Sequence, residues 1–120
     1  MGNPVLALTE FESVTIANGA SITAEINTGG RILCGVYMPA AWTAAGLSFQ
    51  SSPDLGATWY DVHFEGAELT ETAAASIFVS LDWLPFCGVT RLKVRSGTSG
   101  TPVNQGALRT LLLALGRPAV

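Results

Sequence analysis

Apolar and polar residues alternate along most of this chain in short runs that are separated by turn-forming residues. A period of two is typical of half-buried β-strands, because successive side chains of a strand point to opposite faces. Strands spaced roughly 8–12 residues apart, without a long helical run, predict an all-β fold, namely an antiparallel β-sandwich or jelly-roll-like single domain. We expect about eight strands, at residues 13–17, 21–26, 31–38, 47–51, 58–64, 76–81, 89–96 and 109–115.

The first twelve residues differ from the rest of the chain. They carry Pro4 and a weak apolar patch of Val5, Leu6 and Leu8, which is typical of an arm or an edge strand rather than of a core element. We therefore predict an N-terminal arm at residues 1–12 and a β-sandwich domain at residues 13–120. The arm is a candidate to cross a subunit boundary.

Two of the expected strands are apolar on both faces, which predicts that both of their faces are covered. In residues 31–38, Ile32, Cys34, Val36 and Met38 alternate with Leu33, Gly35 and Tyr37. In residues 109–115, Leu111, Leu113 and Leu115 alternate with Leu112 and Ala114. One face of the last strand can fill the sandwich core. Its second face then needs loops or a neighbouring subunit to cover it.

Residues 52–59 contain the most specific local pattern of the chain. They match S-x-D-x-G-x-T-W, which resembles the Asp-box, a β-hairpin turn best known from sialidases and many other secreted or virion β proteins. The matching residues are Ser52, Asp54, Gly56, Thr58 and Trp59. A short carboxylate can accept bonds from its own turn, and glycine permits a positive φ. We interpret the pattern as a structural turn, with a ligand or catalytic loop as the alternative.

The composition limits the classes of function. The 120 residues carry a net charge of −3, which offers no electrostatic basis for binding nucleic acid. The longest apolar run near the C-terminus, at 111–115, is too short to span a membrane, and no secretory signal precedes the fold. Charged residues make up only 12 % of the chain, so its surface is poorly protected against association. We expect a protein that is made in a cytoplasm and works in an assembly.

Half of the six basic residues lie on one strand. In residues 89–96, Arg91, Lys93 and Arg95 alternate with Leu92 and Val94, so we expect the basic side chains to point outward and the apolar ones inward. One interpretation is an edge strand that is protected by charge. The other is a docking strip for an acidic partner.

No pattern of reactive residues predicts an enzyme. His63 is the only histidine, and although Asp61 shares its strand face, no nucleophile motif accompanies the pair. Glu65, Glu68 and Glu71 lie in the most polar connection, which we interpret as a solvated loop. We expect no catalytic residues, no cofactor and no metal.

The two cysteines, Cys34 and Cys87, lie in similar settings, Leu-Cys-Gly-Val and Phe-Cys-Gly-Val. A disulfide or a metal pair is one interpretation. Without a secretory signal or a further Cys/His cluster, we favour two unlinked thiols that face the core.

Residues 37–43, 47–61 and 92–98 resemble small proteins encoded among the structural genes of tailed bacteriophages, and the likeness spans roughly residues 13–115. The resemblance implies a non-enzymatic virion protein, most specifically a capsid decoration (cement) or head-fibre-base protein. Its partner would be the phage major capsid protein or another virion protein. It further implies a homo-oligomer, with a trimer favoured, because decoration proteins of this size often occupy local three-fold axes.

The alternative function is a carbohydrate-binding or host-recognition module on a phage tail or fibre. It would use stacking aromatic residues, although most of these should be core residues or hairpin clamps. The aromatic candidates are Tyr37, Trp42, Trp59, Tyr60 and Trp83. A hydrolase ranks third.

Overall fold

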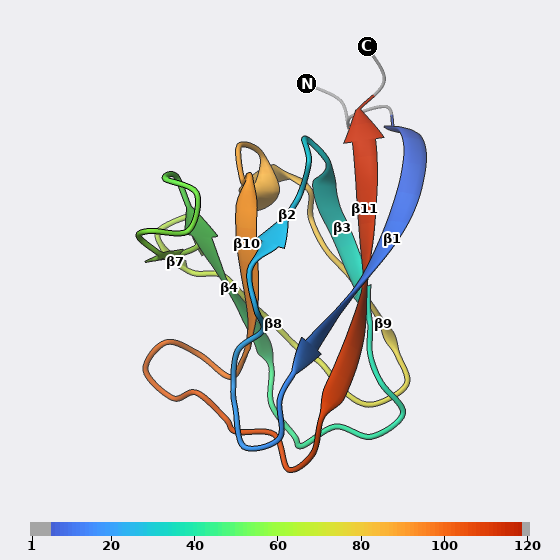
Figure 1. Cartoon of the computed structure of the whole chain (residues 1–120), viewed down its shortest axis with the longest axis vertical. Helices are drawn as coiled ribbons and strands as arrows, with labels where there is room; N and C mark the ends of the chain where they lie inside the picture. Colours follow the sequence, from blue (N-terminus) through green and yellow to red (C-terminus); the bar gives the residue numbers. More distant parts are fainter. Residues whose placement is uncertain (1–5, 119–120) are drawn as a thin grey trace.

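The computed structural model describes the backbone of residues 6–118 and the side chains of residues 9–117. The fold is all-β and antiparallel, with two sheets packed as a sandwich (Figure 1). The four-stranded sheet has the order β1-β11-β3-β9, and the five-stranded sheet has the order β2-β10-β4-β5, with β8 also paired to β4. Strands β6 and β7 form a separate hairpin. This architecture confirms the predicted fold class.

The strands differ greatly in length. The long ones are β1 (Leu6–Ile16), β3 (Ile32–Tyr37), β4 (Leu47–Ser52), β10 (Arg91–Ser96) and β11 (Arg109–Pro118). The short ones are β2 (Ile26–Asn27), β5 (Tyr60–Asp61), β6 (His63–Phe64), β7 (Ala67–Glu68), β8 (Thr70–Glu71) and β9 (Phe78–Ser80), and a 3-10 helix spans Leu84–Phe86. The polar connection after the Asp-box therefore contains several two-residue strands where the sequence predicted one strand and a loop.

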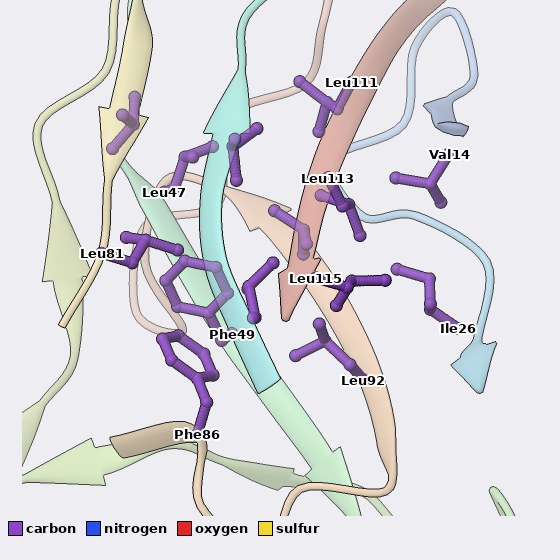
Figure 2. Close-up of a cluster of buried hydrophobic side chains, with 14 of the residues drawn as sticks. Val14, Ile26, Leu47, Phe49, Leu81, Phe86, Leu92, Leu111, Leu113 and Leu115 are labelled. Atoms are coloured by element: carbon purple, nitrogen blue, oxygen red, sulfur yellow. The ribbon is translucent and has the colours of Figure 1, made fainter. Parts of the chain in front are cut away.

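The core lies between the two sheets and is filled by the alternating apolar residues of both (Figure 2). Phe49 of β4 meets Phe86 edge to face, with ring centroids 5.0 Å apart and an interplanar angle of 84°. Each fully buried large apolar side chain contributes roughly 1.5–3 kcal/mol. The most deeply buried apolar residues are Ile16, Leu33, Val36, Leu47, Phe49, Phe86, Leu92, Val94, Leu111, Leu113 and Leu115.

The predicted boundary between residues 12 and 13 does not exist in the structure. Strand β1 spans Leu6 to Ile16 and pairs with β11 along this length, with one irregularity between Leu6 and Leu8. It lies at the edge of its sheet, so the edge-strand alternative fits this segment and the arm does not. Residues 1–5 of the predicted arm lie outside the described part of the chain.

The alternation predicted for residues 31–38 is wrong at its N-terminal half. The register between β11 and β3 shifts at Cys34, where Ala114 pairs with Gly35 but Leu115 pairs with Leu33. This β-bulge brings Leu33 into the core together with Val36 and leaves Cys34 only half-buried. Because the bulge adds one residue to β3, the side chains before it lie on the opposite face of the sheet from the one that strict alternation predicts.

The predicted strand at 21–26 is mostly absent. Ile22 makes one isolated bridge to Arg95, and only the last residue joins β2. Between them the Thr23 N–H donates to the carbonyl of Val94 at 3.0 Å, while the Val94 N–H donates to Thr23 Oγ1 at 3.1 Å. Because the threonine hydroxyl takes the place of a backbone carbonyl, the regular ladder is interrupted there.

Candidate functional site

The Asp-box forms a closed hydrogen-bonded turn. Asp54 Oδ1 accepts from the Thr58 N–H and from Ser52 Oγ, both at 2.8 Å. Ser52 Oγ in turn accepts from the Gly56 N–H at 2.9 Å. Gly56 has φ +91°, and a side chain there would collide with Glu25. The bonds that Asp54 accepts from Thr58, and then from Ser52, lower its pKa.

The tryptophan of the Asp-box holds the turn against the five-stranded sheet. The Trp59 indole N–H donates to the carbonyl of Gly56 at 3.0 Å. The ammonium group of Lys93 on β10 lies 4.5 Å from the centroid of the indole ring, which is a cation–π contact. The polar groups that the pattern supplies are used within the turn and on its own sheet. This geometry matches the structural interpretation of the motif.

The basic residues of β10 are also engaged within the molecule. The outward direction is confirmed for Arg91, which pairs with Glu25, and for Lys93, which lies on the Trp59 ring. Arg95, in contrast, is only 7 % exposed. The edge-strand interpretation is wrong, because β10 lies between β2 and β4. The docking-strip interpretation stays a prediction.

Arg95 is the centre of a buried polar cluster on this sheet. Its Nη2 donates to Asp61 at 2.7 Å and to Glu68 at 2.9 Å, and its Nε donates to Ser48 Oγ at 2.9 Å. Glu68 also accepts from the Ser99 N–H and hydroxyl, each at 3.0 Å. The bond from Arg95 lowers the pKa of Asp61. Glu68 is therefore part of a structural ion-pair network rather than of a solvated loop.

The remaining reactive residues do not converge on a catalytic site. His63 is exposed, and Asp61 beside it is already bonded to Arg95 and to Gln50. Within residues 6–118, no group of three or more His, Cys, Asp or Glu residues could hold a metal ion. Cys34 and Cys87 are both free, as the sequence predicted. They do not face the core, however, because the bulge turns Cys34 aside and Cys87 is exposed after the 3-10 helix.

An open pocket of about 240 Å³ lies between the β2–β3 turn and the loop after the 3-10 helix. Residues 30–32 form one wall and residues 86–90 form the other. The guanidinium group of Arg31 is bonded to Glu10 and Glu12, and the remaining lining is mainly apolar. The pocket has no pair of groups that could serve as nucleophile and base.

The outer face of the four-stranded sheet is the most unusual surface of the molecule. Phe11 of β1, Tyr37 of β3 and Phe78 of β9 point away from the core and are 55 %, 44 % and 45 % exposed. Ring centroids lie 6.1 Å apart for Phe11 and Tyr37 and 4.4 Å apart for Tyr37 and Phe78. Leu112 and Ala114 of β11 lie between β1 and β3 on the same side. We call these five residues the aromatic face.

The aromatic face carries no charge. Among residues 9–117, the other side chains that the four strands direct outward are also uncharged, and they are Ile32, the bulged Cys34, and serine, threonine and glycine residues. The tip of the Phe78 ring packs directly against Gly35, since a β-carbon at Gly35 would come within 2.3 Å of the phenyl ring. Ala114 is buried even though it points outward, so the neighbouring rings cover part of the second face of β11.

Sequence reasoning missed this surface. Phe11 belongs to the predicted N-terminal arm, and Phe78 is not part of any motif recognised in the sequence. The only signal was the apolar character of both faces in residues 31–38 and 109–115, which indicated that the outer face needs a cover. Of the aromatic candidates, only Tyr37 belongs to the aromatic face, whereas Trp59 clamps its turn and Trp42 packs against the core.

The comparisons with known proteins add no relative, because neither a protein-family model nor a curated protein matches the chain. Within residues 6–118, the structure contains no helix that is long and apolar enough to cross a membrane.

Proposed function

We propose that the protein is a non-enzymatic structural component of a tailed-bacteriophage virion, most specifically a decoration protein that binds the outside of the phage head. The aromatic face is the observation that carries this proposal. A charge-free, half-exposed cluster of three rings on one side of a rigid sandwich is suited to bury itself against another protein. The phage context rests on the resemblance of residues 37–43, 47–61 and 92–98 to virion proteins.

The basic side chains are engaged in ion pairs, hydrogen bonds and a cation–π contact within the molecule, which supports docking by apolar contact rather than by charge. All six basic residues contact partners within the molecule. Arg31 and Arg117 bind acidic residues of β1, Arg91 and Arg95 form ion pairs on the five-stranded sheet, Lys93 covers Trp59, and Arg109 donates to Gln105 and Thr43. A partner that recognised this chain by its positive charge would have to break these contacts first.

The expected affinity per copy is modest. Because the three rings are already about half-buried, covering them completely contributes roughly 1 kcal/mol each, or about 3 kcal/mol together. A capsid shell offers many equivalent binding sites. An oligomer can therefore bind several of them at once, and its total affinity exceeds that of a single copy. The proposal therefore joins the aromatic face to the expected oligomer, for which the resemblance favours a trimer.

The aromatic face also bears on the alternative, a carbohydrate-binding module on a tail or fibre. The rings of Phe11 and Tyr37 are inclined by 57°, and those of Tyr37 and Phe78 by 35°. A sugar that stacks on aromatic residues needs a flat platform with polar groups at its border. These tilted rings, with only short hydroxyl side chains beside them, fit a protein partner better.

The test is cosedimentation with heads of the phage that encodes the chain, prepared without this protein. We expect the wild type to pellet with the heads, and the double variant Phe11→Ser plus Phe78→Ser to remain in the supernatant. The matched control is Leu55→Ser plus Tyr60→Ser, which removes two even more exposed apolar side chains outside the aromatic face. The control should pellet like the wild type.

Each outcome decides one part of the proposal. A wild type that binds no part of the virion would overturn the structural role. A Phe11→Ser plus Phe78→Ser variant that binds normally would remove the aromatic face from the contact. Binding of the wild type to a polysaccharide, lost in the same variant, would favour the carbohydrate-binding alternative.

A further inference from the structure

Strand β1 presents a long open edge to solvent. It spans Leu6–Ile16 and forms the margin of the four-stranded sheet, paired on one side only (Figure 1). Its register with β11 is regular from Thr9 to Ile16. Natural edge strands are usually short, bulged or protected by proline or by charged side chains, including charges that point inward. The regular part of β1 is neither short nor bulged and has no lysine or proline. Its two inward-pointing charges, Glu10 and Glu12, are bonded to Arg31 and Arg117 of the same copy.

The backbone groups that face the open edge follow from the alternation of an antiparallel ladder. The Met38 N–H donates to the carbonyl of Ile77, and the Leu81 N–H donates to the carbonyl of Cys34. The backbone N–H and C=O groups of the even-numbered residues at this end of β3 therefore point toward β9. Those of the odd-numbered residues point toward β11. The register of β3 with β11 and that of β11 with β1 extend this alternation to the edge strand. The backbone N–H and C=O groups of the even-numbered residues of β1 therefore face β11. Those of the odd-numbered residues face solvent, and these residues are Thr9, Phe11, Ser13 and Thr15.

The other margins of the two sheets cannot act in the same way. Strand β9 has three residues, and β2 and β5 have two each. Within residues 6–118, β1 is thus the one edge that is long enough to support an additional strand of ordinary length.

We propose that β1 pairs antiparallel with β1 of a second copy of this chain. The two strands overlap most completely when the two-fold axis passes at Phe11. The four-stranded sheets of the two copies then join into one continuous sheet. In this register Phe11 lies opposite Phe11 of the second copy, and Ser13 lies opposite Thr9. Both are pairs in which the backbone groups of the open edge bond to each other.

The side chains of β1 suit a second copy in particular. On the outer side, the two Phe11 rings meet at the axis and connect the two aromatic faces into one surface. On the inner side, Glu10 lies opposite Glu12 of the second copy. These carboxylates are already neutralised in each copy, because Arg31 binds both of them and Arg117 binds Glu10. The contact is therefore self-complementary and needs no charged partner.

The pairing has consequences that differ from those of the proposed function. Antiparallel pairing of one edge with itself has two-fold symmetry, so it produces a dimer and not the trimer that the phage resemblance implies. It requires no other virion protein and can be observed with the purified chain alone. Failure of the dimer would leave the proposed head binding open, and failure of head binding would leave the dimer intact.

The first experiment measures the mass of the purified protein in solution by sedimentation velocity and light scattering. We expect the wild type to be a dimer. Ser13→Pro removes an N–H that faces the open edge, while the bonds of β1 to β11 remain, so this variant should be a folded monomer. Ser13→Ala is the matched control, because it keeps the N–H, and it should remain a dimer.

A wild type that is a monomer or a trimer would overturn the proposal. So would a Ser13→Pro variant that remains a dimer. The circular dichroism spectrum of each variant verifies that the sandwich is folded before its mass is interpreted.

The second experiment tests the register and does not depend on the proline variant. Phe11→Cys is made in a chain in which Cys34→Ala and Cys87→Ser remove the native thiols. Residues opposite each other at the axis have Cα atoms about 5.5 Å apart, which is within the range for a disulfide. Mild oxidation should therefore link two chains covalently. Thr110→Cys, which is exposed on β11 and far from the axis, is the control and should stay unlinked, and equal rates of linkage for the two variants would refute the register.

Discussion

The buried guanidinium of Arg95 provides the most quantitative test of the fold. Arg95→Ala removes the cation that holds Asp61 and Glu68 together, and it leaves two carboxylates close to each other without a counter-charge. Removal of one partner from a buried ion pair costs about 3–5 kcal/mol of unfolding free energy. The side chains of Asp61 and Glu68 are 32 % and 18 % exposed, so water screens part of this loss. We therefore expect a loss of about 2–4 kcal/mol.

Arg91→Ala is the matched control for this prediction. Arg91 lies on the same strand and the same face as Arg95, but it pairs only with Glu25, and both of these side chains are partly exposed. A pair of this kind contributes at most about 1 kcal/mol. Urea unfolding at neutral pH, followed by tryptophan fluorescence, measures both variants on one scale. If Arg95→Ala loses no more stability than Arg91→Ala, our account of the buried cluster is wrong.

Acid titration gives the same prediction a second readout. Because the pKa of Asp61 is lowered in the folded state, its stabilising contribution is present above the ordinary pKa of an aspartate, about 3.9. The contribution is lost as the pH falls through the lower folded-state pKa. The difference between wild type and Arg95→Ala should therefore shrink as the pH falls below about 4. Glu68→Gln, combined with Arg95→Ala, should cost less than the sum of the two single changes.

Three further predictions concern the Asp-box, the aromatic face and the partly buried carboxylate of Glu71. Asp54→Ala should lower the urea midpoint without altering head binding, and loss of binding by a folded variant would make the turn a ligand site. Gly35→Ala should displace the ring of Phe78 and cost about 1–3 kcal/mol in urea unfolding, with a changed near-ultraviolet circular dichroism spectrum, whereas an unchanged spectrum would contradict the close packing. Burial, and secondarily the charge of Asp82, raises the pKa of Glu71, so Glu71→Gln should stabilise the protein at neutral pH. That gain should disappear below about pH 4, and a destabilised Glu71→Gln at neutral pH would refute it.

Local patterns were predictable from the sequence because their partners lie nearby in the chain. Ser52, Asp54 and Thr58 bond to one another within one turn, so their spacing alone indicated the hairpin. The inward direction of Leu92 and Val94 followed from strand alternation, and both are fully buried. Alternation of this kind, repeated along the chain, was sufficient to predict the all-β class.

Strand alternation, however, predicts the direction of a side chain only where the strand has no bulge. The bulge at Cys34 changes which residues of β3 face the core. Gly35 is a local signal, because a glycine inside a strand often accompanies a bulge, but it does not indicate which residue is the extra one. The same limit applies to Arg95, since outward direction on a strand predicts exposure only if nothing covers that face. Here β5 and β7 bring Asp61 and Glu68 over the guanidinium, and these residues come from a separate part of the chain.

The order of the strands was decided only by the tertiary structure. Pairing β1 with β11 brings together the first and the last strand, and this contact makes β1 an edge while β10 becomes interior. The aromatic face arises in the same way, because Phe11, Tyr37 and Phe78 come from three strands that are distant in sequence. The sequence by itself determined the positions of the long central strands and how the Asp-box turn closes. Which strands become neighbours depends on the packing of all apolar faces at once, a non-local condition that no single segment carries.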